Sequence, residues 1–258
     1  MIDSHIHLDA DQYADPSGAI KRARAAGIEA IVAPGTGPGS NQRVIELARA
    51  NRGYVFAAGG FHPERFELTD ADLDATVELI RRERDSICAI GEIGMPWYGE
   101  RAKEPGIRAR AQTVLQRFAR LAVELNLPVI IHAPHDSARD ALAIVCAAGV
   151  RRAVFHWQKS DDATTHAIID AGYFISLTPE VVYRERDQKL ARKVPLGLMM
   201  VETDGPWPHG GPFEGRPTEP AMIVDTVEAI ARVLGVRREL VGAITATNAR
   251  NLFRLARF

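Results

Sequence analysis

The sequence predicts an α/β fold built from eight strand–helix units. Short apolar runs alternate with longer segments whose apolar residues recur at helical spacing, and the runs are apolar on both faces, as in a covered parallel sheet. Eight units in 258 residues give about 32 residues each, which is close to the need of a (β/α)₈ barrel of ~250 residues. We therefore predict a (β/α)₈ TIM barrel that occupies residues 1–258 as a single domain, with a doubly wound open sheet as the alternative.

The predicted strands are short and rich in β-branched or other apolar residues. In chain order they are Met1–His7, Glu29–Ala33, Val55–Phe61, Ile87–Ile93, Pro128–His132, Arg152–His156, Gly172–Leu177 and Met199–Thr203. Helical period, glycine stops and a following proline predict helices between them. These helices are Ser17–Ala26, Ser40–Ala50, Ala71–Arg84, Arg108–Leu125, Ser137–Ala148 and Asp161–Ala171, followed by helices near 181–193, 219–234 and 238–256.

The composition excludes several classes of protein. Hydrophobic residues make up 46% of the chain and 32 Lys and Arg balance 33 Asp and Glu, so an intrinsically disordered chain is excluded. No apolar run reaches the roughly 18–20 residues of a membrane-spanning helix. Asp3 and His5 do not fit a signal peptide, and Cys88 and Cys146 lie in apolar runs typical of buried free thiols. We expect a cytoplasmic protein with no membrane association, no evident protein partner and no global attraction to nucleic acid.

Most of the predicted strands end in a residue type that binds metal ions. These residues are His5, His7, His62, Glu92, His132, His156, Glu202 and Asp204. The carboxyl ends of all strands of a barrel meet on one face, and active sites of this fold lie there. The sequence therefore predicts that these imidazoles and carboxylates surround a single site.

The pair His5 and His7 gives the strongest signal for metal binding. Alternation along a strand directs both imidazoles to the same face. Glu92 follows Ile90 and Gly91 in an apolar strand, where an unpaired carboxylate would cost several kcal/mol and a cation would remove that cost. Together with this set, His132 and His156 are also predicted to be ligands, because each ends an otherwise apolar strand.

The remaining polar candidates lie at or beyond strand ends. Asp204 is predicted to be a ligand, a general base or both, whereas the direction of Glu202 depends on whether the strand stays regular. His135 and His209 lie on loops that follow strands, where each is a candidate for substrate contact. The sequence has no Gly-x-Ser-x-Gly motif, and neither cysteine ends a strand, so covalent catalysis is not predicted.

Several short segments, taken in order, resemble the TatD family of metal-dependent hydrolases, which are amidohydrolase-type TIM barrels. Each segment is modest by itself, but the set is specific because it stays in register over essentially the whole chain. The segments are Asp3–His7, Gly60–Pro63, Gly91–Gly94, Pro128–His132, Phe155–His156, Val201–Pro206 and Asn248–Phe253.

The resemblance implies a site for one or two divalent metal ions, which would be Mg²⁺, Mn²⁺ or Zn²⁺. It also implies that His62 contacts substrate or lies just outside the metals, and that Arg216 opens the family's basic segment after the last strand. Family activities centre on phosphodiester hydrolysis, notably Mg²⁺-dependent DNase or 3′-exonuclease action. The ligands implied for this chain are His5, His7, Glu92 as the carboxylate able to bridge, His132, His156 and Asp204.

Three departures from the family pattern fall on positions that face substrate. Met95–Pro96 replaces the Leu-Asp of the family's Gly-Glu-Ile-Gly-Leu-Asp, so an acidic residue is lost. Ala133–His135 replaces a small residue followed by Arg, and Trp157–Ser160 replaces Cys-Phe-Ser-Gly. The metal ligands are unaffected, so the pattern supports hydrolysis more strongly than it supports nuclease identity.

We therefore predict a metal-dependent hydrolase that cleaves phosphodiester bonds in short single-stranded DNA or a dinucleotide, as a deoxyribonuclease does. Asp204 would act as general base toward a metal-activated water, with Glu92 as its catalytic partner. Two alternatives stay open: hydrolysis of a small ester, lactone, cyclic amide or aminoacyl bond, and a metal-binding barrel without catalysis. The predicted substrate contacts are His62, His135, Trp157, Lys159, Trp207 and Arg216.

Overall fold

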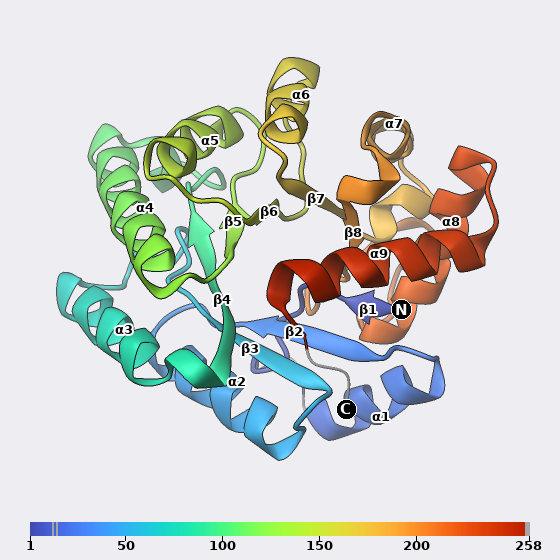
Figure 1. Cartoon of the computed structure of the whole chain (residues 1–258), viewed down its shortest axis with the longest axis horizontal. Helices are drawn as coiled ribbons and strands as arrows, with labels where there is room; N and C mark the ends of the chain where they lie inside the picture. The colour runs from blue at the N-terminus through green and yellow to red at the C-terminus, as the bar shows by residue number, and fades with distance from the viewer. Residues whose placement is uncertain (12, 14, 256–258) are drawn as a thin grey trace.

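Eight parallel strands form one sheet that curls into a barrel, with helices packed around its outside (Figure 1). The computed structural model describes residues 1–11, 13 and 15–255. The strands pair in chain order, which confirms the barrel and excludes the doubly wound alternative, whose strand order reverses at a switch point. They are β1 Ile2–Asp3, β2 Ala30–Pro34, β3 Val55–Gly59, β4 Ile87–Gly94, β5 Val129–His132, β6 Ala153–Phe155, β7 Phe174–Leu177 and β8 Met199–Val201.

Helices connect successive strands and then cover one end of the barrel. They are α1 Pro16–Ala25, α2 Pro38–Ala50, α3 Asp70–Arg82, α4 Pro105–Leu125, α5 Ser137–Ala147, α6 Asp162–Asp170, α7 Glu185–Lys193, α8 Ile223–Leu234 and α9 Arg238–Phe253. The helix predicted near 181–193 is divided, because Pro179–Val182 forms a separate 3₁₀ turn before α7 begins. The last residue of the helix predicted over 238–256 lies outside the described residues.

The first strand is shorter than predicted. After Asp3, the backbone amides bond alternately to both neighbouring segments instead of continuing one ladder. Ser4 N donates to Val201 O at 3.0 Å, and Ile6 N donates to Val32 O at 3.2 Å. The first bond joins the chain that follows β1 to the end of β8 and completes the circle of the barrel, and the second joins it to β2.

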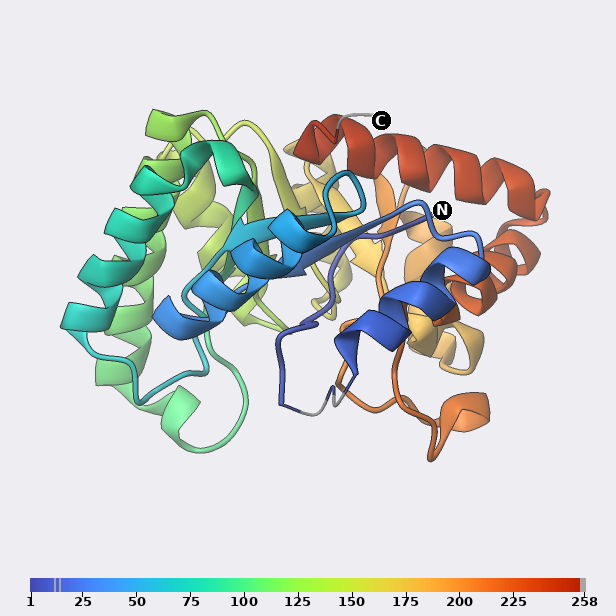
Figure 2. The ribbon, with the colours of Figure 1, turned by 90° about the horizontal axis from the view of Figure 1, so that it is seen from below.

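Apolar side chains fill the inside of the barrel and the space between strands and helices. The inner cluster takes residues from the strands and closes against α9, where Leu252 and Phe253 are almost fully buried. Figure 2 shows α9 on one side of the barrel and the loops that follow β1, β4 and β8 on the opposite side. α9 therefore closes the interior of the barrel at the amino ends of the strands. The inner strand residues are Ile2, Ala30, Val32, Ala58, Ala89, Ile130, Val154 and Met200.

The two cysteines differ in environment, so the prediction of two buried thiols is wrong. Cys88 in β4 is partly buried, whereas Cys146 in α5 is exposed. Cys146 directly follows the buried Val145, and neighbouring helical positions point in different directions. No helix in residues 1–11, 13 and 15–255 is long and apolar enough to cross a membrane.

Gly60 allows the segment after β3 to approach β4 closely. A Cβ there would lie 2.2 Å from Glu92 N and 2.3 Å from Gly35 O, so Gly60→Ala is expected to destabilise the protein by about 1–3 kcal/mol. Urea unfolding measures the change. Gly106→Ala in α4 is the matched control, because its Cβ meets nothing within 4 Å and should leave stability unchanged or slightly higher. Equal unfolding free energies for the two variants would contradict the close approach.

Candidate metal centre

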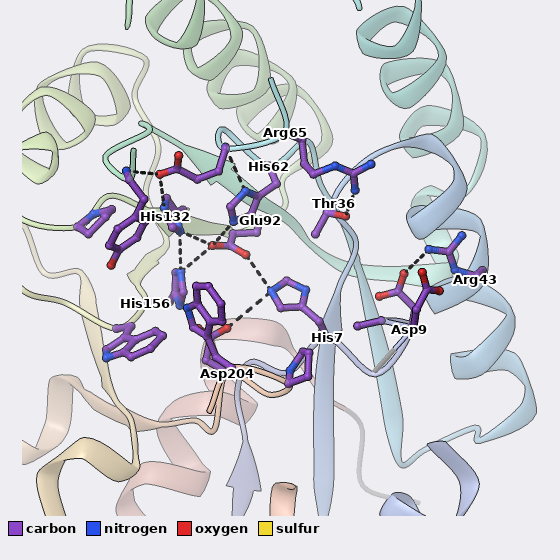
Figure 3. Close-up of a pocket in the computed structure, with 18 of the residues that line it drawn as sticks. His7, Asp9, Thr36, Arg43, His62, Arg65, Glu92, His132, His156 and Asp204 are labelled. Atoms are coloured by element: carbon purple, nitrogen blue, oxygen red, sulfur yellow. Dashed lines mark hydrogen bonds and ion pairs between the residues drawn. The ribbon is translucent and has the colours of Figure 1, made fainter. Parts of the chain in front are cut away.

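Glu92, in β4, lies at the centre of a ring of imidazoles at the carboxyl end of the barrel (Figure 3). Its Oε1 is 2.7 Å from His132 Nδ1 and 2.7 Å from His156 Nε2. Its Oε2 is 3.3 Å from His5 Nε2 and 3.2 Å from His7 Nε2. The structure thus brings together side chains from β4, from β5 and from the segments after β1 and β6, and the two carboxylate oxygens face two separate pairs of imidazoles.

Asp204 joins the side of the cluster that contains His5 and His7. Its Oδ1 lies 3.4 Å from His5 Nε2 and 3.7 Å from His7 Nε2. The backbone of Asp204 has φ 52°, a left-handed conformation that aspartate tolerates better than most residues. Asp3, which is fully buried, accepts hydrogen bonds from Thr203 N at 3.0 Å and Thr203 Oγ1 at 2.5 Å. These bonds tie β1 to the segment that carries Asp204.

The loop after β3 adds His62 and Glu64 to the site. His62 Nε2 is 3.3 Å from Glu92 Oε1, and its Nδ1 accepts a hydrogen bond from Glu64 N at 3.1 Å. Glu64 Oε1 lies 3.4 Å from His132 Nε2 and accepts from Trp97 N at 2.7 Å. Sequence reasoning missed Glu64, although its position two residues beyond a strand-end histidine was an available signal.

Glu202, whose direction the sequence left open, is buried behind His156. Its Oε1 lies 3.4 Å from His156 Nδ1 and accepts a hydrogen bond from Trp157 N at 2.7 Å, while its Oε2 accepts from Ser176 Oγ at 2.6 Å. A carboxylate behind an imidazole fixes the ring's orientation. With Glu202 beside Nδ1, the opposite nitrogen of His156, Nε2, faces Glu92.

Burial and neighbouring charges shift the two central carboxylates in opposite directions. Burial raises the pKa of the Glu92 carboxyl, but positive charge on His62 and His156 outweighs it and holds that pKa well below its usual value. Burial raises the pKa of Asp204 to about 7, and the charge of Glu92 adds to this effect. Glu92 is therefore ionised throughout the neutral range, whereas Asp204 in the ion-free site changes charge within it.

The paired imidazoles of His5 and His7 hold protons unequally. Burial lowers the pKa of His5 to about 4. Burial also disfavours the charged form of His7, but its contacts with Glu92 and Asp204 outweigh this and raise the pKa of His7 to about 9. The Nε2 atoms of His5 and His7 lie 3.2 Å apart. Two positive charges this close repel each other, so without a metal ion only one of the two rings carries an added proton.

The donor set fits divalent cations. Among the described residues, Glu92 Oε2 and His132 Nε2 are buried without a hydrogen-bond partner. Ligand atoms of His5, His7 and Glu92 lie within 4.8 Å of one another, and so do those of His62, Glu92 and His132. An unpartnered buried polar atom costs about 1–3 kcal/mol, which a cation would offset. Mixed imidazole and carboxylate ligands suit Zn²⁺ and Mn²⁺ and also accept Mg²⁺.

We expect the affinity for divalent ions to rise with pH. His7, with a pKa of about 9, and Asp204, with a pKa of about 7, must each lose a proton before they can act as ligands. Calorimetric titration with Mn²⁺ from about pH 6 to about pH 9 should show a falling Kd, by up to about tenfold per pH unit for each proton released. Asp204→Asn should flatten the lower part of this curve. An affinity independent of pH would contradict the proton assignment.

A cavity of about 490 Å³ opens over the cluster. Its floor includes Glu92, His132, His156, His7 and Asp204, and His5 lies beneath them, fully buried. Four of the predicted substrate contacts line this cavity. They are His62, Trp157, Lys159 and Trp207.

Two predicted substrate contacts lie elsewhere. The ring of His135 packs 5.1 Å from the ring of Trp97, and Arg216 is exposed with its guanidinium 5.6 Å from the ring of Phe213. Neither residue lines the cavity, so their substrate contacts stay predictions.

Other residues that line the cavity were not found from the sequence. Tyr98 lies on the loop after β4, and Arg43 lies in α2 and pairs with Asp9 at 3.0 Å. Arg65 bonds to Thr36 Oγ1 at 3.1 Å. These side chains come from loops and a helix surface, where no apolar run or alternation marks a position as functional.

The chain is similar to known proteins over nearly its whole length. A sequence profile described as TatD related DNase matches residues 2–254. Human deoxyribonuclease TATDN3 is 29% identical over 261 residues, which cover 98% of this chain and 94% of that protein. The uncharacterized metal-dependent hydrolase YcfH of Escherichia coli K12 is 31% identical over 265 residues, with coverage of 99% and 96%.

Solved structures agree with the sequence comparisons. The crystal structure of YjjV, a TatD homologue from Escherichia coli K12, has a TM-score of 0.90 and 25% identity, covering 99% of this chain and 98% of that one. The predicted resemblance is thereby confirmed, and relatives named as hydrolases disfavour a non-catalytic barrel. The chain belongs to the TatD-related DNase family and is a metal-dependent hydrolase.

Proposed function

We propose that the protein hydrolyses phosphodiester bonds in short single-stranded DNA or dinucleotides, using divalent ions held at the Glu92 cluster. The observation that carries this proposal is that the two carboxylate oxygens of Glu92 face different pairs of imidazoles. Oε2 faces His5 and His7, and Oε1 faces His132 and His156. A carboxylate placed in this way is suited to bridge two ions. Membership of the family and the name of the human relative support a phosphodiester as the bond cleaved.

The proposed ligands are His5, His7, Glu92, His132, His156 and Asp204. When bound, divalent ions supply a Lewis acid that polarises the scissile oxygen and lowers the pKa of a nearby water. Asp204 accepts the proton of the attacking water, because it lines the cavity and its carboxyl titrates close to neutral pH in the ion-free site. Glu202 orients His156, and Asp3 fixes the backbone beside Asp204.

The cavity wall suits a short anionic substrate with rings. Arg43, Arg65 and Lys159 bring positive charge to the wall. Trp207 and Tyr98 also line it and remain 54% and 39% exposed, so each offers a ring face on which a base can stack. Stacking of one base on an aromatic side chain contributes about 1–3 kcal/mol. A volume of about 490 Å³ lies within the usual ~300–1000 Å³ of small-ligand sites, which favours one or two nucleotides over a duplex.

The aromatic wall also favours a second candidate. A site lined by Trp157, Trp207 and Pro134 accepts apolar small molecules, so hydrolysis of a small ester, lactone, cyclic amide or aminoacyl bond is the alternative. The two candidates share the same metal ligands and differ only in the group attacked.

A substrate screen separates the two candidates. Metal-stripped protein is reloaded with Mg²⁺, Mn²⁺ or Zn²⁺ and assayed on labelled single-stranded DNA, labelled duplex DNA, bis(p-nitrophenyl) phosphate, esters and lactones. We expect cleavage of both phosphodiesters, weaker action on duplex DNA, binding that falls steeply with salt, and loss of activity in His5→Ala. Cleavage of carboxylic substrates alone would overturn the proposal in favour of the alternative.

A further inference from the structure

Three lysine or arginine side chains among the described residues line the cavity, and Lys159 differs from the other two. Arg43 pairs with Asp9 at 3.0 Å, and Arg65 pairs with Glu67. Both guanidinium groups are therefore already engaged by a carboxylate. Lys159 has no carboxylate partner within 4.0 Å in the described part of the chain, although it is partly buried.

Lys159 is held instead by two aromatic side chains, and we name Tyr98, Trp157 and Lys159 together the lysine clamp. Lys159 Nζ lies 3.5 Å from the centroid of the Trp157 ring and donates a hydrogen bond to Tyr98 Oη at 3.2 Å. An ammonium group has three donors and no acceptor. One donor is used by Tyr98, so the clamp presents remaining donors and a full positive charge to the cavity.

The clamp is preformed, because two hydrogen bonds and a constrained backbone fix Trp157. Its backbone has φ 40°, a left-handed conformation that costs a tryptophan about 1–3 kcal/mol and persists only when the surroundings enforce it. Trp157 N donates to Glu202 at 2.7 Å, and the indole Nε1 donates to Glu180 Oε2 at 2.9 Å. Arg186 pairs in turn with that buried glutamate at 2.5 Å.

The backbone next to Lys159 is fixed as well. The Gln158 side chain, which is buried, accepts hydrogen bonds from Lys159 N at 2.7 Å and from Ser160 N at 3.1 Å. These bonds fix the backbone that carries Lys159, and the contacts of its Nζ with Trp157 and Tyr98 hold the side chain. Preorganisation of this kind lowers the entropy cost of binding an anion. These contacts arise from the Trp157–Ser160 segment that distinguishes this chain from the family pattern.

We infer that Lys159 is the receptor for a second phosphate of the substrate, one that flanks the scissile bond. Lysine binds phosphate as a compact point charge, and a clamp beside the Glu92 cluster places that charge within the same cavity as the reaction. The protein's net charge of −1 supplies no general attraction for polyanions, so selection depends on individual placed cations. The inference rests on the proposed function for the identity of the bond cleaved. The anion-receptor role itself does not depend on turnover.

Matched dinucleotides test the inference in the metal-loaded enzyme. The substrate TpT has one phosphate, whereas pTpT and TpTp each carry an additional terminal phosphate on opposite sides of the same diester. We expect one of these two to exceed TpT in kcat/KM by about tenfold or more, mainly through KM. Lys159→Met should abolish that ratio, Lys159→Arg should retain most of it, and the preferred isomer identifies the side that the clamp contacts.

Lys103→Met is the matched control. Lys103 is exposed, pairs with Glu100 at 2.7 Å and does not line the cavity, so the substrate ratio should stay at the wild-type value. A ratio that is the same in wild type and Lys159→Met, whether high or near one, would overturn the inference while leaving the hydrolase proposal intact.

A binding measurement separates failure of the inference from failure of the proposed function. Calorimetry of ion-free protein in EDTA with thymidine 5′-monophosphate should show binding that weakens about tenfold or more in Lys159→Met and is largely retained in Lys159→Arg. If no dinucleotide is cleaved but this dependence is observed, the proposed function fails and the receptor role stands. If the affinity does not depend on Lys159, the receptor role is overturned.

Discussion

Glu92→Gln is expected to lower kcat/KM for phosphodiester hydrolysis by at least about 1000-fold, well beyond the 10–100-fold typical of groups outside the ligand set. The Glu92 carboxylate faces imidazoles through both oxygens, at 2.7 Å on one side and 3.2–3.3 Å on the other. A glutamine amide keeps the shape but presents one oxygen and one NH₂ group and no charge, so it cannot bridge two cations. Steady-state kinetics with bis(p-nitrophenyl) phosphate and elemental analysis of bound metal measure the two consequences.

Glu64→Gln provides the matched control for this experiment. Glu64 also lines the cavity and touches His132, at 3.4 Å, but it lies outside the proposed ligand set. The activity of the Glu64→Gln variant should fall by about 10–100-fold, and the variant should keep its bound metal. If Glu92→Gln kept its metal and lost no more activity than Glu64→Gln, the central place of Glu92 would be refuted.

Asp204→Asn is expected to lower kcat by about 10²–10⁴-fold with a much smaller change in KM. Asparagine preserves the size of the side chain but cannot accept a proton from water. The loss should be accompanied by a changed pH profile. Burial raises the pKa of Asp204 to about 7 in the ion-free site, and a bound cation favours the carboxylate, so the acidic limb of the wild-type profile should lie below about pH 7. The variant's residual activity should lack that limb.

Asp9→Asn is the control for Asp204→Asn, because it removes a carboxylate that lines the cavity but is not proposed as the general base. Asp9 also lines the wall, but it pairs with Arg43 and makes no ion pair with an imidazole within the described residues. We expect less than about a tenfold change in kcat and an unchanged acidic limb. If Asp204→Asn changed kcat and the acidic limb no more than Asp9→Asn does, Asp204 would not be the general base.

The sequence predicted the barrel and its central cluster because one simple rule governs both. Strands buried on both faces are continuous apolar runs, and a polar residue such as His132 or Glu92 at the end of a run marks the carboxyl edge of the sheet. Parallel topology then brings these edges together. The actual strands are shorter at β1 and β8, yet the side chains still converge, because the segments beyond Asp3 and Val201 remain hydrogen-bonded to each other.

The cavity wall could not be predicted in the same way. Glu64 and Tyr98 lie on loops, and Arg43 lies on a helix that reaches the site only through tertiary packing. Loop conformation depends on individual hydrogen bonds, such as the one that Trp97 N donates to Glu64. No repeating pattern of apolar residues in the sequence predicts such bonds. His135 is the opposite case, a residue that the sequence predicted to contact substrate but that does not line the cavity. Its backbone is left-handed, with φ 55°, and its imidazole packs beside Trp97.

The most direct test of the Glu92-centred metal site is a titration of metal-stripped protein with Mn²⁺, in which bound metal and hydrolysis of bis(p-nitrophenyl) phosphate are followed together. We predict no turnover in EDTA, activity that rises with metal binding, and saturation at two ions per chain. Glu92→Gln should bind fewer ions and stay inactive across the titration. Full activity of the ion-free protein, or two ions bound equally well by Glu92→Gln, would contradict the assignment of Glu92 as the bridging ligand.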